Sequence, residues 1–478
     1  MEKIGEKCGV FGIYGRGLDV SRLTFFGLYA LQHRGQESSG IASTDGNKIY
    51  CHKNNGLVSQ VYNEQTIESL PGFIAVGHNR YSTSSGTNVK HAHPIEVSDG
   101  SLALVHNGNL PSTTDLNEFL KNRGVAVEDS SDSTMITEAL HSLVKEGMDI
   151  EQAVVKIFPM MTGSFSLLIL TKEKIIALRD EFGIRPLSIA KLNGGYVFSS
   201  ETCAFHPIGA TFLRDVNPGE MVVVDQKGLR SKQIAKANPK FDIFEFVYFS
   251  RPDSDLMGQS VYEVRKRFGI QLAKEYVIKA DVVIPIPETA IPVAIAYSNA
   301  SGIPFEMGLI KSRYIHRTFI EPEQHIREQG VKLKLSPLKD VINGKRIIII
   351  DDSIVRGTTS RQIVKVLFDA GAKEVHFLVS SPPVKFPDFY GIDIPDQKGL
   401  IAATKSIDEM NTYFGSTSLN FLSYDGMIKA TGINEESFCT ACFTGVYPID
   451  IRERKKEINY NTVKTQPAQA ILFDKIEK

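Results

Sequence analysis

Four consecutive isoleucines followed by two aspartates form the stretch that most restricts how this chain can fold. Ile347–Ile350 lie in the string IIIIDDSIVRGTTS. An unbroken apolar run of this kind is typical of a strand that is buried on both faces of a parallel sheet. Asp351 and Asp352 follow at its carboxyl end, where open α/β sheets bind their ligands. We therefore expect a parallel sheet with a ligand site directly after this strand.

The loop after the two aspartates has the chemistry of a phosphate site. Gly357 permits close approach to the backbone, and the hydroxyl residues Thr358, Thr359 and Ser360 begin a predicted helix, whose N-terminus favours an anion. The two carboxylates suit the hydroxyls of a sugar, so a phosphorylated sugar is the predicted ligand. The string is not the GxxxxGK(S/T) loop of nucleotide triphosphate sites. The alternative is a strand end with an acidic helix cap.

The two halves of the chain differ in their pattern of elements. Up to about Val224, short β-like runs such as SLALVHNGNL predominate, with helical patterns in SRLTFFGLYALQHRG and SDSTMITEALHSLVKEG. This order predicts an α+β domain of antiparallel sheets covered by helices. After a polar boundary segment at 225–241, alternating strands and helices predict an α/β domain with a parallel, doubly wound sheet.

Bulk properties exclude several classes of protein. A chain of 478 residues is too long for one core, and its net charge of −1 gives no general attraction to nucleic acid or anionic membranes. No apolar run approaches the roughly 20 residues that span a bilayer. Five cysteines are too few for a disulfide framework in a chain of this length. We expect a cytoplasmic protein without nucleic-acid or membrane partners.

A cysteine lies eight residues from the start, in MEKIGEKCGVFGIYG. The string GVFGIYG predicts a buried first strand, which would hold Cys8 in a fixed place. If residues 1–7 were removed, Cys8 would carry a thiol and a free α-amine. Their ordinary pKa values, about 8.5 and about 7.7–8.0, make the amine a plausible base for the thiol.

The string IDDSIVRGTTS resembles the 5-phosphoribosyl-1-pyrophosphate (PRPP) loop of the phosphoribosyltransferases, and SIVRGTTS resembles the amidophosphoribosyltransferase family in particular. YFSRPDS, KSRYIHRTFI and CFTGVYP are also similar to that family, in the same order. The resemblance implies that glutamine, PRPP and water give 5-phosphoribosylamine, glutamate and pyrophosphate, the first step of de novo purine (IMP) biosynthesis. It also implies feedback inhibition by purine nucleotides and a homo-oligomer, a dimer or tetramer.

The resemblance further implies the organisation of the chain. A propeptide would occupy residues 1–7, a class II glutamine amidotransferase domain 8–235, a phosphoribosyltransferase domain 236–460 and a tail 461–478. The first domain would be an N-terminal-nucleophile hydrolase with four layers in the order αββα. The second would be an α/β domain with a parallel sheet.

In class II glutamine amidotransferases, which CGVFGIYG resembles, a short leader is cleaved to leave an N-terminal cysteine. Attack of Cys8 on the amide of glutamine would give a thioester, then glutamate and ammonia. HNGNL, which is expected to be a sharp polar turn after a strand, matches the oxyanion segment of the family, with Asn107 and Gly108 as donors. The residues that match glutamine-binding positions are Arg80 for the carboxylate, Asp132 for the α-ammonium and Arg34, which helps to order the surroundings of the nucleophile.

PRPP binding is implied for the loop and for a basic segment before it. The loop residues are Asp351, Asp352, Ser353, Arg356, Gly357, Thr358, Thr359 and Ser360. Lys311, Arg313 and Arg317 are candidate pyrophosphate contacts in a segment that the family uses as a mobile loop over PRPP. Mg²⁺ is the implied cofactor, held by the two aspartates. Where the family commonly has a serine that contacts Mg²⁺, this chain has Ala290.

The pair Cys439 and Cys442 raises the question of a metal. One branch of the family holds a [4Fe–4S] cluster with this pair and two further cysteines, whose positions are matched here by Asp242 and Asp388. Two thiolates and two carboxylates make a poor cage for sulfide-bound iron, although they could hold zinc. Three interpretations therefore stay open: no metal, an atypical or labile cluster, and another metal.

Two other motifs leave alternatives. HAH (His91–His93) could supply two metal ligands, but it matches a polar–Pro segment of the family, which favours a structural role. The PRPP loop could also belong to a non-catalytic PRPP-binding regulator, which would not need Cys8 or the glutamine-binding residues. A nucleobase phosphoribosyltransferase would not explain the first ~230 residues.

Overall fold

Two antiparallel sheets form the N-terminal half. The structure, a computed structural model, describes residues 8–81, 89–126, 130–312, 335–392, 394 and 396–460. One sheet has seven strands in the order β11-β9-β10-β1-β4-β2-β3, and the other has six in the order β13-β12-β8-β7-β6-β5. The strands are β1 Gly9–Tyr14, β2 Ser38–Thr44, β3 Ile49–Asn55, β4 Ile74–Arg80, β5 Ile95–Glu96, β6 Leu102–Ser112, β7 Thr162–Thr171, β8 Ile175–Arg179, β9 Ser188–Leu192, β10 Gly195–Ser199, β11 Thr211–Asp215, β12 Glu220–Asp225 and β13 Gly228–Gln233.

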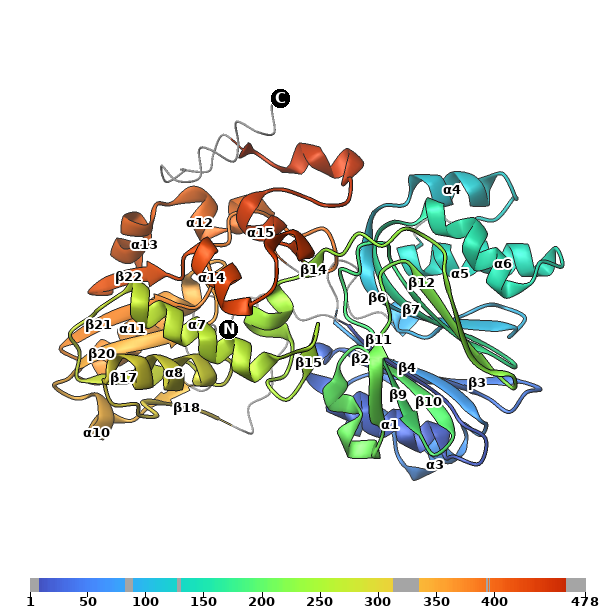
Figure 1. Cartoon of the computed structure of the whole chain (residues 1–478), viewed down its shortest axis with the longest axis horizontal. Helices are drawn as coiled ribbons and strands as arrows, with labels where there is room; N and C mark the ends of the chain where they lie inside the picture. The colour runs from blue at the N-terminus through green and yellow to red at the C-terminus, as the bar shows by residue number, and fades with distance from the viewer. Residues whose placement is uncertain are drawn as a thin grey trace.

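Helices cover the outer faces of both sheets (Figure 1). Val10 and Val76 of the seven-stranded sheet pack against Val105 and Leu168 of the six-stranded sheet, so one core lies between the sheets. A second core lies beneath α1, and a third beneath the helices that cover the six-stranded sheet. These helices are α1 (Val20–Ala30), α4 (Thr114–Lys121), α5 (Asp132–Lys145) and α6 (Ile150–Ile157). The predicted αββα order is confirmed.

The C-terminal half contains a four-stranded parallel sheet in the order β17-β20-β21-β22. Ile348 and Ile350 of β20 face one core, and Ile347 and Ile349 face the other, which explains the unbroken apolar run. The strands are β17 Val282–Pro285, β20 Arg346–Asp351, β21 Glu374–Val379 and β22 Ser418–Phe421. The helices include α7 Val261–Glu275, α8 Ile291–Ser301, α11 Thr358–Asp369, α13 Ile407–Phe414 and α14 Tyr424–Thr431.

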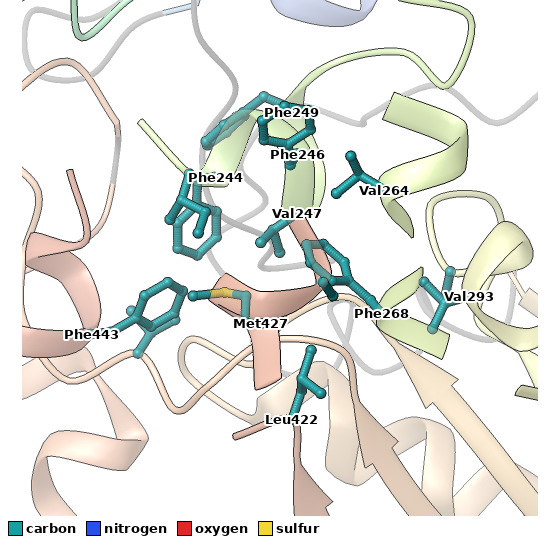
Figure 2. Close-up of a cluster of buried hydrophobic side chains, with 14 of the residues drawn as sticks. Phe244, Phe246, Val247, Phe249, Val264, Phe268, Val293, Leu422, Met427 and Phe443 are labelled. Atoms are coloured by element: carbon teal, nitrogen blue, oxygen red, sulfur yellow. The ribbon is translucent and has the colours of Figure 1, made fainter. Parts of the chain in front are cut away.

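An aromatic segment that follows the N-terminal half packs into a core of the C-terminal half (Figure 2). The strand β14 (Phe241–Asp242) pairs in parallel with β23 (Phe438–Cys439), and a π-helix, Glu245–Phe249, follows it. Phe244 stacks on Phe443 with ring centroids 5.3 Å apart, close to Met427 and Phe268. The segment after the N-terminal half is therefore anchored by the last part of the described chain.

Some local predictions were wrong or incomplete. HNGNL was expected to be a turn, but it lies inside β6 and pairs with β7. Part of the polar boundary segment is the strand β13, whose side chains are half-buried or exposed and therefore lack apolar periodicity. The boundary at 235/236 stays a prediction. Among the residues that the structure describes, no helix combines the length and hydrophobicity needed to cross a membrane.

The packing of α1 on β1 gives a first prediction. A Cβ atom at Gly27 would lie 2.3 Å from the ring of Phe11, and overpacking of this kind costs about 1–3 kcal/mol. The gain in helix propensity from alanine is only about 1 kcal/mol. We expect Gly27→Ala to lower the melting temperature in differential scanning calorimetry. Tyr29→Ala, on the exposed face of α1, is the control and should change it little. An unchanged melting temperature for Gly27→Ala would contradict this packing.

Candidate functional site

Cys8 lies immediately before β1 and is partly buried. Its backbone carbonyl accepts a hydrogen bond from Arg34 Nε at 3.2 Å. Burial raises the pKa of the Cys8 thiol, although a backbone hydrogen bond with Tyr81 and the charges of Arg80 and Arg34 act in the opposite direction. A thiol held in its protonated form needs a nearby base before it can act as a nucleophile.

The two predicted oxyanion donors lie in β6, close to the strand that follows Cys8. Asn107 is buried, and its Nδ2 lies 3.5 Å from Ser200 Oγ. The same hydroxyl accepts a hydrogen bond from Val10 N at 2.9 Å, two residues after Cys8. Gly108 has φ +152°, and a Cβ there would lie 2.1 Å from the carbonyl oxygen of Ser164. Only glycine therefore fits this close approach of two strands.

The two residues predicted to bind the charged groups of glutamine, Asp132 and Arg80, both influence the thiol of Cys8. Asp132 is the first residue of α5, which is capped by Ser131, and its Oδ2 accepts a hydrogen bond from Leu110 N at 3.1 Å. The charge of Asp132 raises the pKa of Cys8 and that of Arg80 lowers it, so both charges act at the sulfur. A carboxylate and a guanidinium so placed suit the α-ammonium and α-carboxylate of an amino acid.

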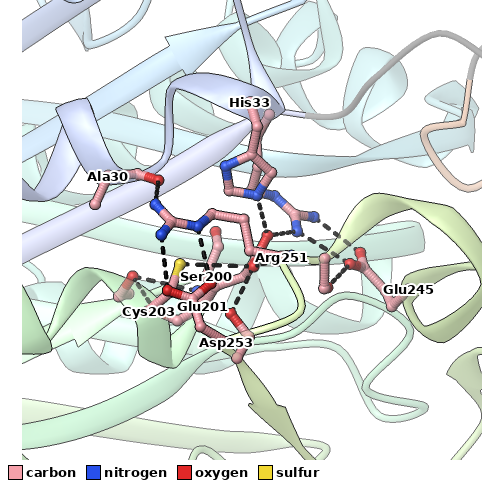
Figure 3. A network of polar contacts seen from close by, with 12 residues as sticks. Ala30, His33, Ser200, Glu201, Cys203, Glu245, Arg251 and Asp253 are labelled. Atoms are coloured by element: carbon pink, nitrogen blue, oxygen red, sulfur yellow. Dashed lines mark hydrogen bonds and ion pairs between the residues drawn. The ribbon is translucent and has the colours of Figure 1, made fainter. Parts of the chain in front are cut away.

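Arg34 belongs to a buried ion network that includes Glu201 and Glu245 (Figure 3). Arg34 is 1% exposed and donates to both carboxylate oxygens of Glu245, at 3.0 and 2.8 Å, and to Glu201. Glu201 also contacts His33 Nε2 at 2.7 Å, and Arg185 donates to Glu245 at 3.2 Å. Arg34 thus links this network to the backbone carbonyl of Cys8, and its predicted roles at the nucleophile and toward glutamine stay predictions.

Sequence reasoning missed Glu201 and Glu245, and one signal for Glu245 was present. FDIFEFVYF places an acid within an aromatic run, and an acid surrounded by buried aromatics requires a buried cation or donors. The hydrogen bonds to Glu245 come from Arg34, Arg185 and Ser250. Glu245, an acid within a segment of otherwise core-type residues, was therefore the sequence signal for the contact between the two halves.

A loop of the C-terminal half contacts the oxyanion segment directly. Asn109 Nδ2 donates to the carbonyl of Phe389 at 2.8 Å, and Ser164 Oγ donates to the carbonyl of Tyr390 at 2.6 Å. A Cβ at Gly391 would lie 3.0 Å from the backbone of Gly108. The backbone of 389–391 thus packs on the segment predicted to stabilise the oxyanion.

The second candidate site lies at the carboxyl end of β20. Asp351 and Asp352 are both buried, and Ser353 Oγ donates to Asp352 Oδ1 at 2.8 Å. Gly357, at φ +77°, is the N-cap of α11, so the positive end of this helix lies at the loop. Thr358 begins the helix. The exposed side chain of Arg356 precedes this turn, the side chain of Thr359 is half-buried, and that of Ser360 is buried.

The donor set of this loop fits Mg²⁺. Mg²⁺ is commonly held by one or two carboxylates, waters and substrate phosphates, and Asp351 and Asp352 supply the carboxylates. Ala290 is buried at the start of α8 and has no side-chain oxygen to offer. Lys311 ends β18 (Leu309–Lys311), with Nζ 3.8 Å from Glu288 after β17. Arg313 and Arg317 lie outside the described residues.

Asp242 and Asp388, which match the other two cluster positions of that family branch, lie near enough to Cys439 and Cys442 for their charges to raise the pKa of both thiols. Asp242 Oδ2 pairs with Arg185 at 2.8 Å and its Oδ1 accepts from Phe244 N, while Asp388 Oδ1 accepts two backbone N–H groups. These carboxylates are bound by their own chain. Among the described residues, no three or more His, Cys, Asp or Glu side chains are arranged to hold a metal. Burial raises the pKa of Asp242 to about 6 and that of Asp388 to about 7.

The chain is similar to known proteins over nearly its whole length. The family described as "Glutamine amidotransferase domain" matches residues 78–207, and "Phosphoribosyl transferase domain" matches 258–381. The amidophosphoribosyltransferase of Synechococcus elongatus is 49% identical over 458 residues, which cover 94% of this chain and 93% of that protein. That of Bacillus subtilis is 44% identical over 458 residues, 94% and 95% of the two chains.

A solved structure extends the similarity to the fold. It is glutamine PRPP amidotransferase from B. subtilis complexed with ADP and GMP, which aligns with a TM-score of 0.86 at 43% identity and covers 93% of this chain and 98% of that one. A glutamine amidotransferase and a phosphoribosyltransferase in one chain define a glutamine-dependent glycosyltransferase. The chain belongs to the amidophosphoribosyltransferase family.

The buried network predicts a strong effect of removing Glu245. Glu245→Ala leaves Arg34 and Arg185 partly uncompensated in a site without water access, and breaking a buried pair of this kind costs about 3–5 kcal/mol. We expect a lower melting temperature and a lower yield of folded protein. Glu263→Ala, which removes an exposed pair with Lys266, should change stability by less than about 0.5 kcal/mol. Equal melting temperatures for the two variants would contradict the network's role.

The carboxylate contacts give a prediction about metal content. Protein purified without air should contain no stoichiometric iron, zinc or acid-labile sulfide, because Asp242 and Asp388 are committed to Arg185 and to backbone donors. Elemental analysis and the absorbance near 400 nm measure this. The double variant Asp242→Cys, Asp388→Cys offers four thiols and is the positive control. Iron bound stoichiometrically to the unmodified chain would refute this prediction.

Proposed function

We propose that this chain makes 5-phosphoribosylamine from glutamine and PRPP, with glutamate and pyrophosphate as the other products. One observation carries the proposal: a cysteine site with oxyanion donors and a strand–Asp–Asp–loop–helix site occur in one chain, and backbone from the second half packs on the first site. The family relationship supports the same two-step chemistry.

The first step would be hydrolysis of glutamine at Cys8. After removal of residues 1–7, the α-amine of Cys8 takes the thiol proton, which a thiol of raised pKa does not release unaided. The thiolate attacks the side-chain amide carbon, and the oxyanion forms between Asn107 Nδ2 and the N–H of Gly108. Ammonia leaves with that proton, and water releases glutamate from the thioester. Arg80 and Asp132 would hold the two charges of the amino-acid group.

The second step would transfer the ammonia to C1 of PRPP as pyrophosphate leaves. The 5-phosphate would bind at the start of α11, at residues 356–360, and Asp351 and Asp352 would face the ribose hydroxyls. The two aspartates would hold Mg²⁺, which would supply positive charge for the leaving pyrophosphate. Lys311, Arg313 and Arg317 would contact the same group.

Regulation and assembly belong to the same proposal. The related B. subtilis structure is described as a complex with ADP and GMP, which supports purine nucleotides as inhibitors of this chain. We propose a cytoplasmic homo-oligomer, a dimer or tetramer. The propeptide 1–7 and the tail 461–478 lie outside the described residues.

The test separates the two steps with one variant. Intact mass spectrometry should find a chain that begins at Cys8. Cys8→Ala should abolish synthesis from glutamine and leave synthesis from ammonia near the unmodified level, because the second site lies on separate strands. Ser381→Ala in the C-terminal half is the matched control and should keep both activities. Loss of neither activity in Cys8→Ala, or an inactive chain that only binds PRPP, would refute the proposal.

A further inference from the structure

Two stacked histidines hold the backbone of the residue before the oxyanion donors. The rings of His78, on β4, and His93 lie with centroids 4.3 Å apart at an angle of 25°. His78 Nε2 donates to the carbonyl oxygen of His106 at 3.0 Å, and His106 N–H donates to His93 Nδ1 at 3.2 Å. Both backbone polar groups of His106 are thus bound by histidine side chains.

The histidines take the place of a neighbouring strand. On one side, β6 pairs in register with β7 from Leu102 to Asn109, with His106 opposite Leu167. On the other side, β5 pairs only with Ala103 and Leu104. Two residues beyond that pairing, the backbone of His106 would lack partners in a buried location, and an unpaired buried peptide group costs free energy.

These hydrogen bonds require one protonation state. His93 Nδ1 can accept from a backbone N–H only if it carries no proton, and His78 Nε2 must carry one to donate to a carbonyl. Burial lowers the pKa of His78 to about 3 and that of His93 well below its ordinary value. The charged or titratable groups that act on the pair are Arg80, His106 and Lys53, and each favours the neutral form of His93.

We propose that His78 and His93 are positioning residues for glutamine hydrolysis, because they hold the two peptide groups on either side of His106: His93 accepts from the N–H of the Val105–His106 peptide, and His78 donates to the carbonyl of the His106–Asn107 peptide. The carbonyl of His106 and the N–H of Asn107 belong to one rigid peptide plane. Its rotation would move the Asn107 side chain and the N–H of Gly108, the two donors of the oxyanion site. This inference rests on the proposed function.

The contact with His106 gives His93 of HAH a structural role. A metal ligand at His93 would need the Nδ1 lone pair or a free Nε2, and Nδ1 is already bound to the backbone of His106. The structural role expected of HAH is therefore a specific one, acting on the glutamine site through a backbone contact. Only Pro94 separates His93 from β5, and the His93 ring lies against the backbone N–H of His106.

The test compares His93→Leu with His93→Gln in the processed chain. Leucine cannot accept the hydrogen bond, so kcat for glutamine hydrolysis should fall by about 10–100-fold with KM for glutamine little changed. Glutamine's Oε1 can accept it, so His93→Gln should recover most of kcat. Synthesis from ammonia should be unchanged in both. His141→Leu, an equally buried histidine bound to Asp99, is the control and should keep kcat.

Several outcomes would overturn the inference. They are an unchanged kcat in His93→Leu, a kcat in His93→Gln as low as that of His93→Leu, and an equal loss in His141→Leu. Nitrogen NMR of histidine in the unmodified chain is a second measurement that needs no variant to fold. It should find His93 neutral with its proton on Nε2, and a proton on Nδ1 would refute the inference. Absence of glutamine hydrolysis in the unmodified, processed chain would instead refute the proposed function.

Discussion

The burial of two arginine side chains between the halves of the chain is the constraint on which the arrangement depends. Arg34 and Arg185 are almost without solvent contact, and a buried guanidinium is stable only where carboxylates and carbonyls surround it. Glu245 lies in the segment that begins the C-terminal half, and it accepts hydrogen bonds from both arginines. Because Arg34 also binds the carbonyl of Cys8, the position of the nucleophile is coupled to an acid that belongs to the other half.

Each site uses a different property of its sheet. At the first site, the proposed donors lie in an antiparallel strand, where Gly108 allows a close approach of β6 to the carbonyl of Ser164 in β7. At the second, the carboxyl end of β20 and the start of α11 place carboxylates and a helix dipole together without any irregular strand. The proposed hydrolytic site therefore relies on many individual contacts, whereas the proposed phosphate site follows from the strand–loop–helix order alone.

The sequence predicted what depends on local pattern. Ile347–Ile350 and the two aspartates specified a doubly buried strand and its ligand end, and the alternation of short runs indicated the layered N-terminal half. Contacts between distant segments were not predictable. Nothing near Glu201 indicated that it would meet Arg34, and β22 is a short strand whose pattern, SLNF, is also compatible with a loop.

HNGNL shows why a polar string can be misread. Polar residues with glycine are typical of turns, but here His106 and Asn107 are buried in a strand because side chains from three other segments satisfy their polar groups. The same reason applies to His93. Its proposed role depends on the contact between its ring and the backbone N–H of His106, which the string HAH does not indicate. Sequence patterns indicate whether a segment faces solvent or the core. The burial of these residues depends instead on hydrogen bonds from side chains of other segments.

The contact of 389–391 with the oxyanion segment bears on how freely the two halves can be exchanged between relatives. The C-terminal half supplies main-chain carbonyls to Asn109 and Ser164, so side-chain identity at Phe389 and Tyr390 is of secondary importance to this junction. Gly391 is different, since any larger residue would meet Gly108. A chimaera of two homologues would thus tolerate different side chains at 389 and 390 but not a change in the length of this loop. The two halves are therefore better regarded as one structural unit than as interchangeable domains.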